Sequence, residues 1–489
     1  MDDPLNSDDE YEMRERMAST TSEDGLLPGG STKLRRRSCA HRVFGTRSFE
    51  RTAFAVVSFA LLCVVVFRKN ETIVRWRDRF QDYAKERVVP SHERVILKYK
   101  EPQSTFRANL REDLEYVTTF AYGGLTNQLL GMFKLVHVAQ RLDREVILPD
   151  LHAEHNEGSE ARYSEFFDLT FLSEKTGVSM AEWRDLKTLK NDSTTDTTRE
   201  DLSCWGMAWP TRPLLPYDTH IYYWPYPTAL RANYTVEASI TFPGIEVLNA
   251  QDNTAFLNET ALERFGPDAT DVPEYPNTHL LCFQNLFYAS SVKFVEGHLD
   301  RSVNIEELRA DGPVWSKVGQ WLRFNARVNS LVDETLDALV GDKSQVFLAV
   351  HLRQDDFVTM NRTTNKVDEI EQIYQDGLAA LRSKLEASPV LEGIDVGELP
   401  VLVATDSNDT KLFAEFDRMG WTFIDHDKLK TVERYGGWYP SVLDSAIISR
   451  AIGLVGTKMS TFSFLAERRI ETWNGGMGVI VGQEPRDSA

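Results

Sequence analysis

The sequence is poor in cysteine, with only four among 489 residues. These cysteines show no Cys-X-X-Cys pair and no zinc-like spacing, which excludes a cysteine-based zinc site and a thioredoxin-like thiol pair. Cys39 and Cys63 lie near the N-terminus. Cys204 and Cys282 could form one disulfide in an oxidising compartment, or could remain two buried thiols.

Positive charge and several catalytic fingerprints are also scarce. Lys and Arg number 55 against 74 Asp and Glu, giving a net charge of −19, which argues against a nucleic-acid-binding surface. The chain has no Gly-X-Gly-X-X-Gly dinucleotide fingerprint, no Gly-X-Ser-X-Gly nucleophile elbow and no internal repeat. A hydrophobic content of 42% is nevertheless ample for large cores, and the length favours two domains.

Long hydrophobic runs are absent except for the uncharged stretch Ala53–Phe67. Its fifteen residues would span roughly 22 Å as a helix, short of a ~30 Å hydrocarbon core, but Arg51 and Arg68 could snorkel at its ends. A signal-peptide core is the main alternative and a buried core helix the other. Because about fifty residues precede the run, too many for an ordinary signal peptide, we predict an uncleaved single-pass signal anchor at 52–67.

Basic residues are densest before this anchor, in 33–51, so residues 1–51 are predicted to form a disordered cytosolic tail and the remainder to be lumenal. Localisation to the ER or Golgi membrane follows. Asn-X-Ser/Thr sequons fit this topology, because all of them follow the anchor. They lie at Asn70, Asn191, Asn233, Asn258, Asn361 and Asn408, of which Asn70 is too close to the bilayer for modification.

The globular part begins after a charged stem at 68–112. Strand, glycine turn, helix and strand patterns follow one another over Val117–Tyr122, Asn127–Asp143 and Glu145–Leu148, which is a βαβ unit. The polar segment 184–203 is predicted to be an exposed loop.

Strand and helix patterns also alternate in the second half. Strands are predicted at Val346–Val350, Leu399–Ala404, Thr422–Ile424 and Gly453–Val455; helices are predicted at Trp315–Leu339, Glu369–Leu385, Lys411–Met419, Val442–Ala451 and Ser460–Arg469. This alternation predicts an α/β fold with parallel sheets. We expect two Rossmann-like domains, 113–305 and 306–489, that face a cleft.

Polar residues follow several of these strands. His351 and Arg353 follow one, Thr405-Asp406 a second and Gly456-Thr457 a third, while Ser460-Thr461-Phe462-Ser463 opens a helix. Each has an ordinary structural explanation, such as a helix cap or a surface ion pair. Ligands nevertheless bind at the carboxyl ends of strands in α/β sheets, and an Arg beside a helix N-terminus suits a diphosphate.

Two further motifs are less specific. Gly123-Gly124 after the first strand would let the backbone approach a phosphate or sugar, or would simply make a tight turn. Asp425-His426-Asp427 could supply carboxylates to Mg²⁺ or Mn²⁺, but such short strings are common by chance and we predict no metal site.

Taken in chain order, these motifs resemble those of the fucosyltransferases that use GDP-fucose. The protein O-fucosyltransferases are the nearer match and the α1,6-fucosyltransferases a more distant one. The matching segments are Gly123 to Gln128, His351-Leu352-Arg353 with Asp356, and Asp444 followed by Gly456-Thr457 and Ser460 to Ser463.

The resemblance implies an inverting glycosyltransferase of the GT-B type that holds GDP-fucose in the cleft and needs no metal or other cofactor. It assigns the β-phosphate to Arg353, the nucleotide to His351 and the guanine edge to Asp444. Ser460, Thr461 and Phe462 would line the diphosphate and sugar, and Asn127 with Gly123 and Gly124 would cover the donor. Arg353 and Asn127 would be the catalytic residues.

The acceptor is less well defined. One relative carries a glutamate in the first glycine loop, where this chain has no acid, so Asp355 or Asp356 could serve as the base. The α1,6 enzymes have a second Arg where this chain has Gln354, which argues against a core-chitobiose acceptor. The resemblance to the protein O-fucosyltransferases implies a protein Ser/Thr hydroxyl as the acceptor. A glycan acceptor, a transferase for another nucleotide sugar and an inactive lumenal lectin or scaffold are the alternatives.

Overall fold

The computed structural model describes the ranges 95–153, 159–188, 200–206, 232–241, 279–283, 286–287, 308–341, 346–359, 363–388 and 395–482. Almost all of these residues belong to one compact unit formed by 88–385 and 397–489. The predicted tail and signal anchor lie outside the described residues. Among the helices in the ranges above, none has both the length and the apolar character needed to cross a membrane.

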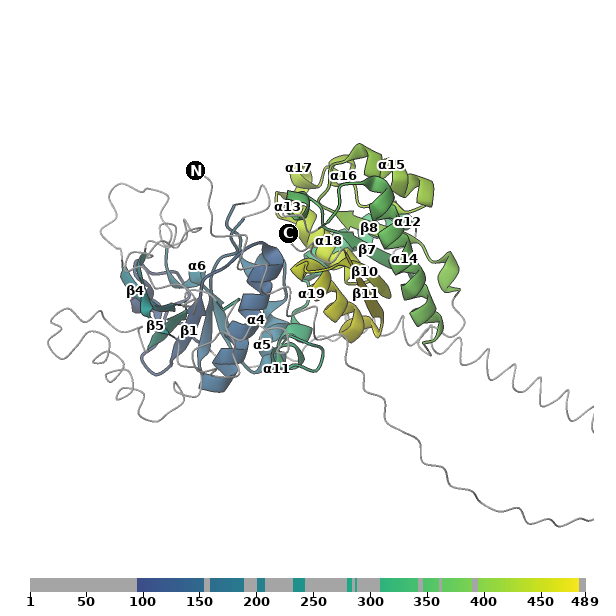
Figure 1. Cartoon of the computed structure of the whole chain (residues 1–489). Coiled ribbons are helices and arrows are strands. Elements are labelled where there is room, and N and C mark those ends of the chain that lie inside the picture. Colours follow the sequence, from purple (N-terminus) through teal and green to yellow (C-terminus); the bar gives the residue numbers. More distant parts are fainter. Residues whose placement is uncertain are drawn as a thin grey trace, which may run out of the picture. The chain divides into compact units, whose positions relative to one another are not determined.

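The first half contains a six-stranded parallel sheet in the order β3-β2-β1-β6-β4-β5 (Figure 1). Its strands are β1 (Tyr116–Thr119), β2 (Glu145–Leu148), β3 (Met180–Glu182), β4 (Glu200–Gly206), β5 (Ala232–Thr241) and β6 (Leu280–Phe283). All residues of β1, β2 and β6 are buried, as expected for parallel strands covered on both faces.

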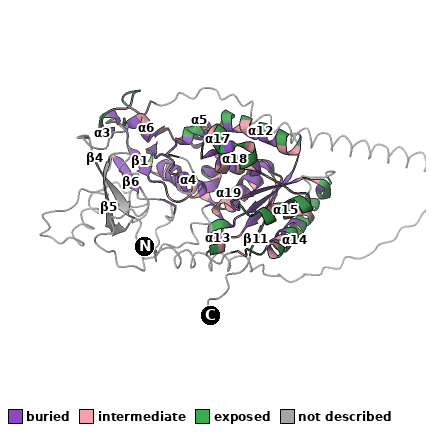
Figure 2. Cartoon of the chain, turned by 90° about the horizontal axis from the view of Figure 1, so that it is seen from above, coloured by how far each residue is buried: buried purple, intermediate pink, exposed green. Residues whose placement is uncertain are grey.

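Helix α4 (Leu125–Leu142) connects β1 to β2 and has buried residues along most of its length (Figure 2). Its N-cap is Gly124 and its C-cap is Asp143, whose left-handed backbone (φ 53°) stops the helix. The other helices in this half are α3 (Phe106–Asn109), α5 (Leu169–Thr176), α6 (Trp183–Leu186), α11 (Pro313–Lys317) and α12 (Ala326–Val340), with 3₁₀ turns η1 (Tyr163–Glu165) and η2 (Gly319–Trp321).

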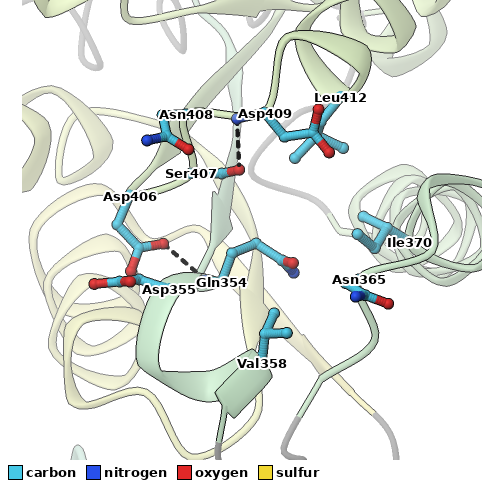
Figure 3. A pocket seen from close by; sticks show the side chains of 10 residues that line it. All are labelled: Gln354, Asp355, Val358, Asn365, Ile370, Asp406, Ser407, Asn408, Asp409 and Leu412. Carbon is cyan, nitrogen blue, oxygen red and sulfur yellow. Dashed lines mark hydrogen bonds between the residues drawn. The ribbon is translucent and has the colours of Figure 1, made fainter.

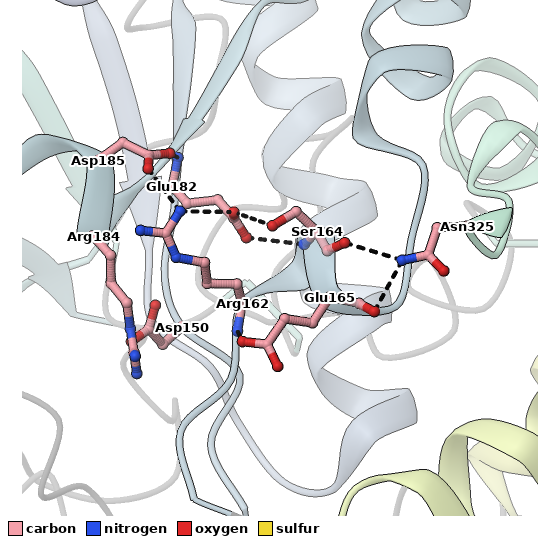
Figure 4. Close-up of polar contacts among 8 residues, drawn as sticks. All are labelled: Asp150, Arg162, Ser164, Glu165, Glu182, Arg184, Asp185 and Asn325. Atoms are coloured by element: carbon pink, nitrogen blue, oxygen red, sulfur yellow. Dashed lines mark hydrogen bonds and ion pairs between the residues drawn. The ribbon is translucent and has the colours of Figure 1, made fainter. Parts of the chain in front are cut away.

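Charged side chains cluster where β2 and β3 end (Figure 4). Asp150, whose side chain is 3% exposed, accepts from Nε of Arg184 at 2.5 Å. Glu182 accepts from the Ser164 hydroxyl at 2.5 Å, and Arg162 lies between Glu182 and Asp185. Burial raises the pKa of Asp150 and of Glu182, even though their partners act in the opposite direction.

The second half contains a five-stranded parallel sheet in the order β11-β10-β7-β8-β9. Its strands are β7 (Leu348–Leu352), β8 (Val401–Thr405), β9 (Thr422–Phe423), β10 (Gly453–Thr457) and β11 (Met477–Val481). His351 lies opposite both Gly456 of β10 and Ala404 of β8. The carboxyl ends of β7, β8 and β10 therefore meet at one edge of the sheet.

Helices cover both faces of this sheet. One face is covered by α14 (Val367–Glu386). Leu381 and Leu385 of this helix lie, together with Leu348 of β7, around Gly453 of β10. On the other, α18 (Tyr439–Ile448) packs on β7 and β8, and α19 (Thr461–Arg469) packs on β10. The remaining elements are α13 (Asp355–Thr359), α15 (Thr410–Met419), α16 (His426–Leu429), α17 (Thr431–Tyr435), the turn η4 (Val396–Glu398) and η5 (Ile470–Asn474), a π-helical turn.

The predicted α/β fold with parallel sheets is confirmed, and most predicted elements differ from the observed ones by only a few residues. The predicted helix Trp315–Leu339 was wrong, because the Asn325 side chain caps a new helix by accepting from Val328 N–H. The predicted loop 184–203 was also wrong at both ends: α6 begins before it and β4 enters it at Glu200.

Residues assigned to the stem also enter the core. Ile96, Phe106 and Leu110 are buried in a cluster with Tyr116 of β1 and Trp183 of α6. The hydrophobic packing therefore begins at Ile96 or earlier, within the segment that was predicted to be a stem ending at residue 112. The domain boundaries at 112 and 305 stay predictions.

Candidate active site

His351 is the last residue but one of β7 and not, as predicted, the first residue after the strand. It is 5% exposed, and its ring stacks on Phe462 with a centroid distance of 4.4 Å and an interplanar angle of 21°. Burial, with a smaller contribution from the charge of Arg353, lowers the pKa of His351 to about 3. The imidazole is therefore neutral near pH 7.

Ser463 determines which ring nitrogen of His351 carries the proton. Its hydroxyl oxygen accepts the Thr457 N–H at 2.9 Å and lies 2.7 Å from His351 Nδ1. Among the described residues, His351 Nδ1 is the acceptor available to the hydroxyl proton, so Ser463 donates to it. The neutral ring then carries its proton on Nε2, which becomes a hydrogen-bond donor.

The Thr457 hydroxyl joins the ends of β7 and β10. It donates to the His351 carbonyl at 2.9 Å and accepts from Arg353 N–H at 2.8 Å. Tyr374 of α14 donates to the same oxygen at 2.7 Å, because the single Thr457 proton is already used. Tyr374 is buried, and burial raises its pKa far above the ordinary range. The backbone around Arg353 is thus fixed from two neighbouring elements.

Arg353 follows directly after β7, and its side chain is 23% exposed. One terminal nitrogen pairs with an Asp406 carboxylate oxygen at 2.9 Å. The other Asp406 oxygen accepts the Gln354 N–H at 2.7 Å, so Asp406 holds both the side chain of Arg353 and the backbone after it. A guanidinium presents N–H groups in a planar fork that matches the oxygens of a phosphate.

Helix α19 begins at the same edge of the sheet. Ser460 is its N-cap and accepts from Ser463 N–H, as the sequence predicts for this motif. The preceding residue, Met459, has a left-handed backbone (φ 71°), an unusual conformation for a side chain of this size. Gly456 is needed here, since an added Cβ would lie 2.7 Å from the Cβ of Ser463.

Asn127 is brought to α19 by a direct contact. The Thr461 hydroxyl donates to Oδ1 of Asn127 at 2.7 Å, which links α19 to the first turn of α4. Gly123, just before α4, has a φ of +67°, and an added Cβ would lie 2.5 Å from Nδ2 of Asn127. Gln128 fixes this glycine turn by donating to the carbonyls of Gly123 and His152.

Asp444 is placed by a histidine. His426 Nε2 lies 2.9 Å from one Asp444 oxygen, and His426 Nδ1 lies 3.0 Å from the Thr431 hydroxyl. Burial lowers the pKa of His426, but the attraction of Asp444 and weaker contributions from Asp425 and Asp427 outweigh it, so the net shift is upward. No described residue is recorded as a hydrogen-bond partner of the second carboxylate oxygen of Asp444.

A model of one protein family, described as GDP-fucose protein O-fucosyltransferase, matches residues 116–472. The match covers more than half of the chain and includes every motif described above. The chain belongs to the GDP-fucose protein O-fucosyltransferase family. It is therefore a glycosyltransferase that uses GDP-fucose.

Solved structures of fucosyltransferases are among the similar folds. POFUT1 in complex with GDP-fucose is 18% identical, with a TM-score of 0.47, and the match covers 76% of this chain and 99% of that chain. NodZ alpha-1,6-fucosyltransferase soaked with GDP-fucose is 10% identical, with a TM-score of 0.35 and coverages of 73% and 93%. NodZ from Bradyrhizobium has a TM-score of 0.32, with 11% identity and coverages of 72% and 93%. No curated protein sequence matches.

The remaining residues of the predicted site and the predicted glycosylation sites are only partly described. Asp355 is exposed at the start of α13, whereas the side chain of Asp356 lies outside the described residues. Asn408 is exposed in the loop after β8. The side chain of Asn233, and residues Asn70, Asn191, Asn258 and Asn361, lie outside the described part of the chain.

The structure describes one of the two cysteine side chains of the predicted disulfide. Cys282 of β6 is disulfide-bonded. Strand β4, which contains Cys204, pairs with β6, and Trp205 lies opposite Phe283. The register is compatible with a Cys204–Cys282 bond, but the side chain of Cys204 lies outside the described residues, so the pairing stays a prediction.

Several residues of the site were not predicted from the sequence. Asp406 was predicted only as a polar residue at the end of a strand, and its pairing with Arg353 was not predicted. Tyr374 and His426 reach the site from helices 83 and 18 residues away from their partners Thr457 and Asp444. Gln128 does belong to the family motif at the glycine turn, which was the available signal.

Proposed function

We propose that this O-fucosyltransferase transfers fucose, with inversion, from GDP-fucose to a Ser or Thr hydroxyl of proteins in the secretory pathway. One observation carries the proposal. Arg353, His351 and the start of α19 meet at a single edge of the second sheet and are held there by the Thr457 and Ser463 hydroxyls. That edge is where a leaving diphosphate requires positive charge and N–H donors.

The reaction breaks the bond between the fucose carbon and a β-phosphate oxygen. The electron pair stays on that oxygen, and the acceptor oxygen bonds to the carbon from the opposite side. We assign the stabilisation of the leaving charge to Arg353, which stays protonated at any working pH, and to the N-terminal N–H groups of α19. Because these groups supply the positive charge, no metal ion is required in this proposal.

The nucleotide and the sugar use the remaining groups. His351 would donate from Nε2, and Asp444 would accept from the guanine edge through the oxygen that His426 does not hold. Ser460, Thr461 and Phe462 would line the diphosphate and sugar. Asn127 with the Gly123–Gly124 backbone would cover the donor, as in a GT-B arrangement of two Rossmann-like domains. Asp355 or Asp356 would take the proton of the acceptor.

We place the enzyme in the ER or Golgi membrane. The uncharged run 52–67 would act as a type II anchor, with 1–51 in the cytosol and the catalytic part in the lumen. Sequons beyond the anchor support this topology, since N-glycosylation acceptors mark lumenal chains.

Mass spectrometry of secretory proteins incubated with GDP-fucose and the enzyme tests this function directly. Deoxyhexose added to Ser or Thr is the expected product, whereas deoxyhexose found only on glycans would contradict the protein acceptor.

Nucleotide binding tests the donor. GDP should stabilise the enzyme against heat and UDP should not. Asp444→Asn should weaken GDP binding about a hundredfold in calorimetry, because an amide N–H would face the guanine donors. Equal affinity of the wild type and the variant would remove Asp444 from the proposed site.

A further inference from the structure

Arg353 and Asn127 are each held in place by a second side chain. Asp406 pairs with the Arg353 guanidinium at 2.9 Å and accepts the Gln354 N–H at 2.7 Å, a bond drawn in Figure 3. Asn127 has a comparable partner in Thr461, whose hydroxyl donates to its Oδ1 at 2.7 Å. Asn127 and Thr461 are both half-buried. Asp406 holds a charge, whereas Thr461 sets the orientation of an amide.

The bond between Thr461 and Asn127 joins the starts of two helices. Asn127 lies in the first turn of α4, which follows β1 of the first sheet, and Thr461 is the first residue of α19, which follows β10 of the second sheet. A helix N-terminus carries partial positive charge. The bond therefore brings two positive helix ends together, at the edge of the second sheet where Arg353 also lies.

The same bond determines which end of the Asn127 amide faces a ligand. A carbonyl oxygen carries no proton, so the Thr461 hydroxyl is the donor and its single proton is used in this bond. The other end of the amide, Nδ2, lies over Gly123, where an added Cβ would be 2.5 Å from it. The amide thus presents its N–H groups beside the glycine turn that the proposed function assigns to the donor.

We infer that Thr461 is a positioning residue for fucosyl transfer: it holds the Asn127 amide so that the N–H₂ end, and not the carbonyl, meets the leaving β-phosphate oxygen. That oxygen gains negative charge as its bond to fucose breaks, so a fixed N–H donor stabilises it and a carbonyl oxygen would repel it. Thr461 acts through Asn127 and not by donating to the diphosphate. The inference deepens the proposed function and rests on its placement of Asn127 over the donor.

Thr461→Val tests the inference, because valine has nearly the shape of threonine and no hydroxyl. With the full chain in detergent, radiolabelled GDP-fucose and secretory proteins as acceptors, kcat for GDP release should fall about tenfold. The KM for GDP-fucose and the melting temperature without nucleotide should change little. Thr461→Ser keeps the hydroxyl and should retain most of the wild-type kcat. Thr335→Val is the matched control, since the Thr335 hydroxyl donates to the Leu331 carbonyl within α12, and it should leave kcat unchanged.

A double-mutant cycle separates positioning from direct contact. In Asn127→Ala, which has no amide to orient, adding Thr461→Val should lower kcat no further. A second fall of similar size would show that Thr461 acts on the diphosphate itself and would overturn the inference. A Thr461→Ser enzyme as slow as Thr461→Val, or a Thr461→Val enzyme changed only in KM or melting temperature, would overturn it as well.

Failure of the proposed function would look different. If the wild type released GDP without adding deoxyhexose to Ser or Thr, the protein acceptor would be wrong. The comparison of the Thr461 variants would still hold, because GDP release reports the departure of the diphosphate whatever the acceptor is.

Discussion

At the scale of single residues, the protonation state and tautomer of His351 depend on hydrogen bonds that cannot be read from the sequence. His351 is a neutral donor because it is buried, stacked on Phe462 and held at Nδ1 by Ser463. The sequence predicts that His351 and Arg353 lie at a strand end. It does not predict the tautomer, since Ser463 is 112 residues away and reaches the ring only through the pairing of β7 with β10.

The lowered pKa of His351 predicts a pH effect on folding. The unfolded chain takes up this proton below about pH 6.5 and the folded chain only near pH 3, so the stability is complete above 6.5 and is lost as the pH falls. As the pH falls from 7.5 to 5.0, the contribution of His351 lowers the free energy of unfolding by about 2 kcal/mol. In urea unfolding, His351→Gln should lose less stability than the wild type over this range. Equal losses would contradict the burial of a neutral ring.

At the scale of elements, the strands and helices next to the site were largely predictable, because their apolar periods are strong and their ends carry glycine, serine or aspartate. Strand β10 and helix α19 are examples. The wrong predictions concern elements that depend on partners distant in sequence. Strand β4 is polar in sequence but pairs with β5 and β6. The helical pattern around Asn325 is divided because the Asn325 side chain caps α12. Residues contributed by neighbouring helices, such as Tyr374, fail for the same reason.

The junction of β10 and α19 gives a prediction about packing. Gly456→Ala would push Cβ against Ser463 and should cost roughly 1–3 kcal/mol, together with most of the GDP affinity. Gly131→Ala in α4 is the control, because its added Cβ meets only Phe287 N at 3.7 Å and should stabilise the helix by about 0.5–1 kcal/mol. Thermal unfolding with and without GDP measures both. If Gly456→Ala left both the melting temperature and the GDP affinity unchanged, the structure would accommodate the added Cβ without cost.

At the scale of the whole molecule, two clusters of paired charge differ in burial: the Arg353–Asp406 pair at the β7–β8 edge is partly exposed, whereas Asp150 and Glu182 at the ends of β2 and β3 are buried. Asn325 ties the second cluster to α12 by donating to the carbonyls of Ser164 and Glu165. Composition shows only that the chain is acidic. Which carboxylates are buried and paired follows from the two sheets, and could not be predicted from the sequence.

Removing one partner in this cluster should destabilise the protein strongly. Arg184→Met would leave Asp150 buried without its cation, at a cost of about 3 kcal/mol at neutral pH. Because the pKa of Asp150 is already raised and would rise further, the folded variant binds a proton that the unfolded chain releases. Its stability is therefore retained at low pH and lost as the pH rises.

Urea unfolding at pH 5.0 and 7.5 checks this direction. Arg418→Met, which removes two ion pairs of an exposed arginine, with Glu371 and Glu415, should leave the midpoint unchanged at both pH values. A destabilisation of Arg184→Met that grows toward low pH would contradict the account of Asp150.

The central claim is that Arg353 at the end of β7 stabilises the leaving diphosphate of GDP-fucose. The most direct measurement is kcat for fucosyl transfer by Arg353→Ala, compared with the wild type, using enzyme whose GDP-independent melting temperature is unchanged. The account predicts a fall of at least about a hundred- to thousandfold, as for the loss of a donor to a developing anion. Near-normal transfer by the folded variant would contradict it.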